Sequence, residues 1–191
     1  MSESRFIAAK DGLRLHALDY GDRHSSRLPV VCLPGLTRTV EDFAVLAAAL
    51  ANERRVLSLD YRGRGRSDYD PNPDHYAIAV ETADVVTVMA ALEAMPAIVV
   101  GTSRGGLIAM TLAAERPEVL AGVVLNDIGP VVDIEGESGS RAMSANCSTQ
   151  RAIRRLPNFS GTARETSFRS SAPPIGWPRP NAAGARKPAG S

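Results

Sequence analysis

The sequence predicts an α/β protein with a doubly wound, mostly parallel sheet, and three observations predict it. Short apolar runs alternate with segments of helical periodicity between residues 29 and 126. The run at residues 29–33 lacks polar alternation, which is typical of a strand buried on both faces. Turns containing glycine or proline separate the runs. Strands that alternate with helices imply a parallel sheet with helices on both faces.

The chain opens with a hairpin signal. Asp11-Gly12 separates the apolar runs 6–9 and 13–20, and this dipeptide tolerates the positive φ angles of a tight turn. Such a hairpin adds an antiparallel edge to a parallel sheet.

The remaining expected elements follow in strict alternation. Thr39 is placed to cap the first helix, and Pro96 is placed to end the second. In order along the chain, they are a strand at 29–33, a helix at 40–50, a strand at 55–59, a helix at 78–95, a strand at 97–100, a helix at 105–116 and a strand at 120–126. On the first helix, four apolar residues share one face: Phe43, Leu46, Ala47 and Leu50.

The composition limits the classes of partner and compartment. The 191 residues include 22 basic and 21 acidic side chains, so the chain as a whole gives no reason to expect a nucleic-acid or membrane partner. Two cysteines form no disulfide framework, which favours a reducing, cytoplasmic location. We expect no signal peptide, because no long apolar stretch follows the N-terminus.

The last third of the chain differs from the rest. Residues 1–135 carry 13 basic and 19 acidic side chains, a net charge of −6, whereas residues 136–191 carry 9 and 2, a net charge of +7. Sixteen valines precede residue 136 and none follows it. A segment this poor in large apolar residues cannot offset its ordering entropy. We therefore expect an ordered α/β part over residues 1–134 and a disordered, basic tail over residues 135–191. The abrupt change and the excess of residues with GC-rich codons are also consistent with translation in a shifted frame.

One motif carries chemistry. Residues 101–105 read Gly-Thr-Ser-Arg-Gly and match G-x-S-x-G, between an expected strand and an expected helix. The alternative is an ordinary glycine-rich turn. In this context the motif predicts a sharp, strained turn that exposes the hydroxyl of Ser103 at the carboxyl edge of the sheet. The helix N-terminus there favours a developing negative charge.

Residues 1–134 resemble the N-terminal part of the α/β-hydrolase superfamily, in its esterase, lactonase and haloperoxidase-like branch. Four pieces occur in the family's order: the opening hairpin, the turn at 34–36 (Pro-Gly-Leu), the loop at 60–67 (Asp-Tyr-Arg-Gly-Arg-Gly-Arg-Ser) and the motif at 101–105. The sequence departs from the family where histidine is usual, with Pro34 before the glycine and Arg64 in the middle of the loop. Neither change removes a backbone donor.

The resemblance implies roles for several residues. Ser103 is the expected nucleophile, and the backbone amides of Leu36 and Arg104 are the expected oxyanion hole. The implied substrate is a small ester or lactone, with no cofactor and no metal ion. Asp127, after the last expected strand, is a candidate for the acid of the triad, and its alternative role is to brace the following turn.

The expected histidine base is missing. In the family's triad the histidine follows the serine, but His16, His24 and His75 all precede Ser103. We interpret these three as solvent-exposed or packing histidines, and the family's seventh and eighth strands are missing from the pattern. The sequence therefore predicts an incomplete hydrolase, impaired as it stands. The alternative is a non-catalytic fragment or a binding module that retains the pocket. The sequence leaves the oligomeric state open.

Overall fold

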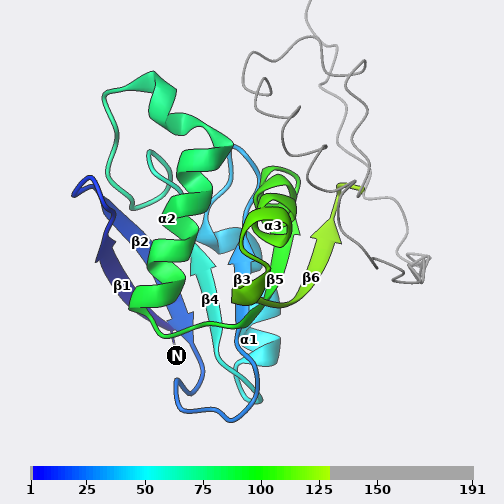
Figure 1. Cartoon of the computed structure of the whole chain (residues 1–191). Coiled ribbons are helices and arrows are strands. Elements are labelled where there is room, and N and C mark those ends of the chain that lie inside the picture. Colours follow the sequence, from blue (N-terminus) through cyan, green and yellow to red (C-terminus); the bar gives the residue numbers. More distant parts are fainter. Residues whose placement is uncertain (1, 130–191) are drawn as a thin grey trace, which may run out of the picture. The chain divides into compact units, whose positions relative to one another are not determined.

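A six-stranded mixed sheet forms the centre of the part of the chain that the computed structural model describes, residues 2–129 (Figure 1). Its order is β1-β2-β4-β3-β5-β6. The β1–β2 and β2–β4 pairs are antiparallel, and the other three are parallel. This confirms the predicted sheet and its antiparallel edge. The strands are β1 (Ser2–Ala8), β2 (Arg14–Tyr20), β3 (Val30–Leu33), β4 (Val56–Leu59), β5 (Ala97–Thr102) and β6 (Leu120–Asn126).

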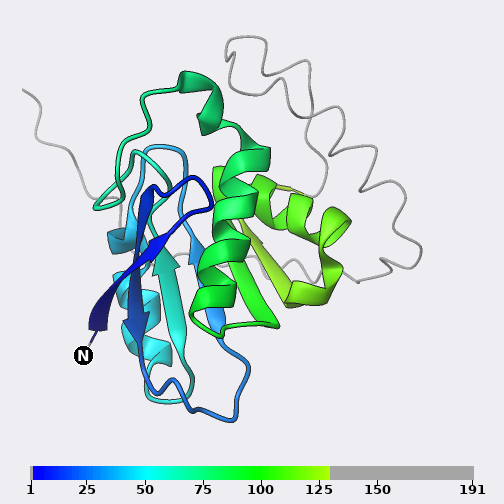
Figure 2. The same cartoon turned by 60° about the vertical axis from the view of Figure 1, so that its left-hand side comes forward.

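Helices cover both faces of this sheet, as the alternating pattern predicts. Figures 1 and 2 show α2 and α3 on one face and α1 on the other. A large apolar cluster lies under α2 and α3, and a smaller one that includes Cys32 and Phe43 lies under α1. The helices are α1 (Ala44–Leu50), α2 (Ile78–Ala91) and α3 (Arg104–Glu115), with 3-10 turns η1 (Val40–Phe43), η2 (Pro73–Tyr76) and η3 (Pro117–Val119).

The helix expected at residues 40–50 is divided into η1 and α1. Thr39 makes no side-chain cap hydrogen bond, so the predicted cap is wrong. The Val40 amide donates instead to Asp60 Oδ1 at 2.9 Å. A long-range carboxylate therefore supplies the acceptor that local sequence assigned to threonine. Leu46, expected on the buried face, is exposed.

The second helix ends earlier than the proline at residue 96 predicts. Helix α2 stops at Ala91 because Glu93 adopts a left-handed conformation, with φ of 54°. The Ala94 amide then donates to the carbonyl of Met89 at 2.9 Å, which closes the helix end.

The predicted tail, residues 135–191, lies outside the described residues. Within residues 2–129, no helix has the length and apolar character needed to cross a bilayer.

Candidate active site

Ser103 occupies the sharp turn between β5 and α3. Its backbone has φ of 49° and ψ of −109°, a combination rarely adopted by a residue with a side chain. The side chain is exposed. The Ser103 amide donates to the carbonyl of Asn126 at 3.1 Å, which ties the turn to the end of β6. The strained strand-turn-helix geometry predicted from the motif is present.

The two motif glycines are required by close packing of the backbone. A Cβ at Gly101 would lie 2.4 Å from the carbonyl oxygen of Gly105. A Cβ at Gly105 would lie 2.1 Å from the carbonyl oxygen of Leu33, on the neighbouring strand. Neither clash can be relieved by rotating a side chain. The local motif therefore satisfies a constraint imposed by both the turn and the sheet.

The turn at residues 34–36 lies beside Ser103. A Cβ at Gly35 would lie 4.0 Å from the Cβ of Ser103. The Arg64 guanidinium donates to the carbonyl of Leu36 at 2.8 Å, and the Tyr61 hydroxyl donates to the carbonyl of Pro34 at 3.0 Å. Among residues 2–129, the amides of Leu36 and Arg104 donate no hydrogen bond. The two expected oxyanion donors are thus unpaired in the described part of the chain.

The Arg104 side chain is buried and has its own partners. Its Nε donates to Glu81 Oε2 at 2.6 Å, and its Nη2 donates to the carbonyl of Tyr76 at 2.6 Å. This ion pair joins the start of α3 to α2. Burial raises the pKa of Glu81, and the Arg104 guanidinium partly offsets that shift. No local sequence pattern predicts this pair, because its members lie 23 residues apart.

Asp127 directly follows the residue that accepts from the Ser103 amide. It is exposed and has φ of 55°. Next along the chain, Ile128 packs on the start of α3, where a Cβ at Gly106 would lie 2.3 Å from its Cγ2. The structure therefore brings residues 126–128 to the turn that carries Ser103. The role of Asp127 as the acid of the triad stays a prediction.

The three histidines of the chain lie in the described part, and none of them hydrogen bonds to Ser103. His16 is 1% exposed, with Nδ1 at 2.7 Å from Asp60 Oδ2 and Nε2 at 3.1 Å from Ser4 Oγ. His24 is exposed. His75 lies in η2, and its Nδ1 is 2.8 Å from Asp70 Oδ2.

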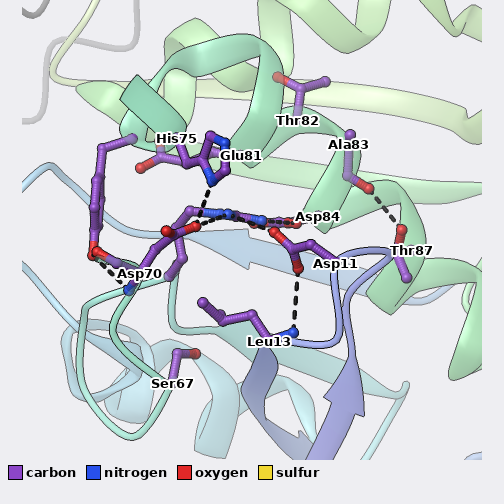
Figure 3. A network of polar contacts seen from close by, with 12 residues as sticks. Asp11, Leu13, Ser67, Asp70, His75, Glu81, Thr82, Ala83, Asp84 and Thr87 are labelled. Carbon is purple, nitrogen blue, oxygen red and sulfur yellow. Dashed lines mark hydrogen bonds and ion pairs between the residues drawn. The ribbon is translucent and has the colours of Figure 1, made fainter. Parts of the chain in front are cut away.

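A second polar cluster is organised around Arg62, which is 1% exposed. Figure 3 shows its acidic members Asp11, Asp70 and Asp84, with His75 beside Asp70. The guanidinium donates to both oxygens of Asp84, at 2.7 and 2.8 Å. Its Nη1 donates to Asp70 at 2.7 Å and to Asp11 at 3.0 Å. The hydrogen bond from Arg62 holds the pKa of Asp11 below its usual value despite the opposing effect of burial, whereas burial raises the pKa of Asp84.

Three groups in this cluster have the spacing of metal ligands. Atoms of Asp11, Asp70 and His75 lie within 4.8 Å of one another, beside an open hollow also lined by Tyr69. The Arg62 guanidinium hydrogen bonds to both carboxylates, and Asp70 also holds the imidazole. A cation here would face a guanidinium, so these residues do not fit a built metal site. Sequence spacing did not predict the cluster, because Asp11 lies far along the chain from Asp70 and His75.

Comparison with known proteins gives one consistent result. A family model described as the alpha/beta hydrolase fold matches residues 29–171, a match that extends beyond residue 134. The chain is 40% identical over 128 residues to a 3-hydroxybutyrate-oligomer hydrolase of Cupriavidus necator, covering 65% of the chain and 43% of that protein. It is 36% identical over 104 residues to the sn-1-specific diacylglycerol lipase ABHD11 of Mus musculus, covering 53% and 33%.

A solved structure agrees with these matches. The crystal structure of an alpha/beta hydrolase from Novosphingobium aromaticivorans is similar with a TM-score of 0.65 and 46% sequence identity, covering 71% of the chain and 47% of that protein. The chain thus spans less than half the length of each of these relatives.

Proposed function

The chain belongs to the alpha/beta hydrolase fold family, and on that premise we propose that Ser103 is the nucleophile of a hydrolase for small carboxylic esters or lactones. One observation carries this proposal: an exposed serine in a left-handed turn lies beside the turn at residues 34–36, and the amides of Leu36 and Arg104 have no partner among residues 2–129. Relatives named as an oligomer hydrolase of a hydroxy acid and as a lipase support an ester as the substrate.

The proposed chemistry is acyl transfer. Ser103 Oγ would attack the carbonyl carbon, and the resulting oxyanion would accept hydrogen bonds from the two amides. Backbone amides suit this task because their orientation is fixed before the reaction begins. The hydrogen bond from Arg64 to the Leu36 carbonyl and the buried Arg104–Glu81 pair support that fixed orientation. Asp127 remains the proposed triad acid.

The proposal includes a deficit in proton transfer. A serine hydroxyl needs a base to become nucleophilic at neutral pH. His16 and His75 hydrogen bond to aspartates, and His24 is exposed and makes no hydrogen bond to Ser103 among the described residues. We therefore expect this polypeptide alone to hydrolyse esters slowly. A well-formed site without one triad member retains about 10³–10⁴-fold acceleration over water.

A second candidate function follows from the same deficit. The chain would be a non-catalytic module that retains the hydrolase pocket and binds an ester or lactone without turning it over. The observation that favours it is that no histidine hydrogen bonds to Ser103 within the described residues.

The test compares the wild type with Ser103→Ala in the hydrolysis of an activated aryl ester, with Ser26→Ala as a control for loss of an exposed hydroxyl. We expect slow turnover that exceeds that of Ser103→Ala and is unchanged in Ser26→Ala. Equal, feeble rates for all three would support the non-catalytic module. Rapid wild-type turnover that Ser103→Ala abolishes would show that one of the three histidines is the base, and His75 would be tested first.

A further inference from the structure

We propose that Ser4 is a second activated serine, able to accept an acyl or phosphonyl group from an activated donor. It forms a relay with two other side chains. Ser4 Oγ lies 3.1 Å from His16 Nε2, and His16 Nδ1 lies 2.7 Å from Asp60 Oδ2. This is the order of contacts by which a hydroxyl is activated through an oriented imidazole.

The hydrogen-bond donors and acceptors determine where the protons lie. A carboxylate accepts only, so the proton shared by His16 and Asp60 belongs to Nδ1 of the imidazole. In the neutral imidazole Nε2 is then an acceptor, and the Ser4 hydroxyl donates to it. Arg66 Nη1 donates to Ser4 Oγ at 2.7 Å. In this neutral form the relay has the hydrogen-bond pattern that general-base catalysis requires.

The imidazole and the carboxylate are held rigidly. Both side chains are 1% exposed. The centroid of the Phe6 ring lies 5.1 Å from that of the His16 ring. Asp60 also accepts from the amides of Val40 and Arg66, at 2.9 and 3.1 Å. Among the described residues, Ser4 Oγ is the group that hydrogen bonds to His16 Nε2.

Ser4 itself is reachable from solvent. It is exposed, and it lies on β1, the first strand in the sheet order, which pairs with β2 alone in residues 2–129. Three strands separate β1 from β5, the strand that leads to Ser103. The two serines are therefore independent, and the Ser4 relay goes beyond the function proposed for Ser103.

The reaction is acyl transfer to the side chain. Ser4 Oγ forms a bond to the carbonyl carbon of an aryl ester, and the bond from that carbon to the aryloxy oxygen breaks. The hydroxyl proton passes to His16 Nε2 and from there to the departing aryloxide or to water. The product is an O-acyl serine plus a phenol. Negative charge develops on the former carbonyl oxygen of the ester, and the Arg66 guanidinium, in contact with Ser4 Oγ, is a cation beside the attacked carbon that stabilises it.

The test measures where and how fast the full chain is labelled. The Ser103→Ala variant is incubated with p-nitrophenyl acetate, and in parallel with a fluorophosphonate, and adducts are located by peptide mass spectrometry over time. Ser2 is the internal control, since it is an exposed serine on the same strand, placed opposite Tyr20 in the register. General-base assistance predicts labelling of Ser4 at least about 100-fold faster than that of Ser2.

Two further measurements connect the labelling to the relay. Replacing the base, His16→Asn, should reduce the rate at Ser4 to that at Ser2, with folding checked by circular dichroism. Because His16 is buried, its replacement could also unfold the chain, so a second comparison keeps His16. The Ser103→Ala variant is labelled in a denaturing concentration of urea, where the rates at Ser4 and Ser2 should become equal. Equal rates in the native chain, or a Ser4 rate that survives denaturation, would overturn the proposal. Neither outcome bears on Ser103, which is absent from the tested variant.

Discussion

The buried pair Arg104–Glu81 allows a quantitative prediction about stability. Replacing Arg104 by methionine retains a long side chain but leaves the carboxylate of Glu81, 2% exposed, without its 2.6 Å partner. Removal of one member of a buried pair costs about 3–5 kcal/mol of unfolding free energy. That is a large share of the roughly 5–15 kcal/mol by which a domain is stable. We expect Arg104→Met to lower the denaturation midpoint in urea strongly.

The loss should depend on pH. Burial raises the pKa of Glu81 above its usual value of 4.5. At pH values well below 4.5 the Glu81 carboxyl is protonated in both the folded and the unfolded chain, so its burial carries no charge penalty. Above the raised pKa it is ionised in both states, and the full penalty applies. Without Arg104 the folded-state pKa rises further, so the difference between variant and wild type should be large at pH 7 and shrink toward pH 4.5.

Urea unfolding curves at the two pH values measure this difference, with two controls. Arg116→Met removes an exposed arginine just after the same helix, whose partner is Glu118, and should cost at most about 1 kcal/mol. The double variant Arg104→Met, Glu81→Leu removes both charges and should recover most of the loss. A loss below about 1 kcal/mol for Arg104→Met, or one that is equal at both pH values, would refute the reasoning.

Three further predictions follow from the fold. Gly105→Ala should abolish cooperative unfolding in thermal melts, because the added Cβ would lie 2.1 Å from the carbonyl oxygen of Leu33. The control Gly122→Ala should melt nearly as the wild type does, because its Cβ would make only an ordinary contact at 4.0 Å. Val124 is 50% exposed on β6, which pairs with β5 alone in the described sheet. The chain should therefore self-associate in size-exclusion chromatography, and Val124→Lys should reduce that self-association. Limited proteolysis should remove the tail to about residue 135 and leave a resistant core; an equally resistant tail would contradict its predicted disorder.

The sequence by itself determined the order and kind of the elements. Strand and helix periodicities depend on neighbouring residues, and they predicted each strand of the described sheet to within four residues. The largest difference is at β1, which begins at Ser2 although the apolar run begins at residue 6. The motif at 101–105 predicted a strained turn for the same reason, because its two glycines and its place between a strand and a helix are visible in the linear chain. Sequence also showed that no histidine follows Ser103.

Only the tertiary structure decided which distant side chains meet. The cap of the 40–50 segment comes from Asp60, and the same carboxylate orients His16, 44 residues away. No local pattern distinguishes these partners, because a buried polar group selects whichever donor the fold brings within about 3 Å.

The charged clusters show the same limit. Arg62 and Arg104 read in the sequence as ordinary basic residues, yet each is buried against carboxylates from other segments. Burial forces such pairing, since an isolated charge in the interior costs far more than an exposed one. Hydrophobic periodicity records where a segment faces the core, but it carries no information on which charge will neutralise which. That information appears only when the sheet brings its loops together at one edge.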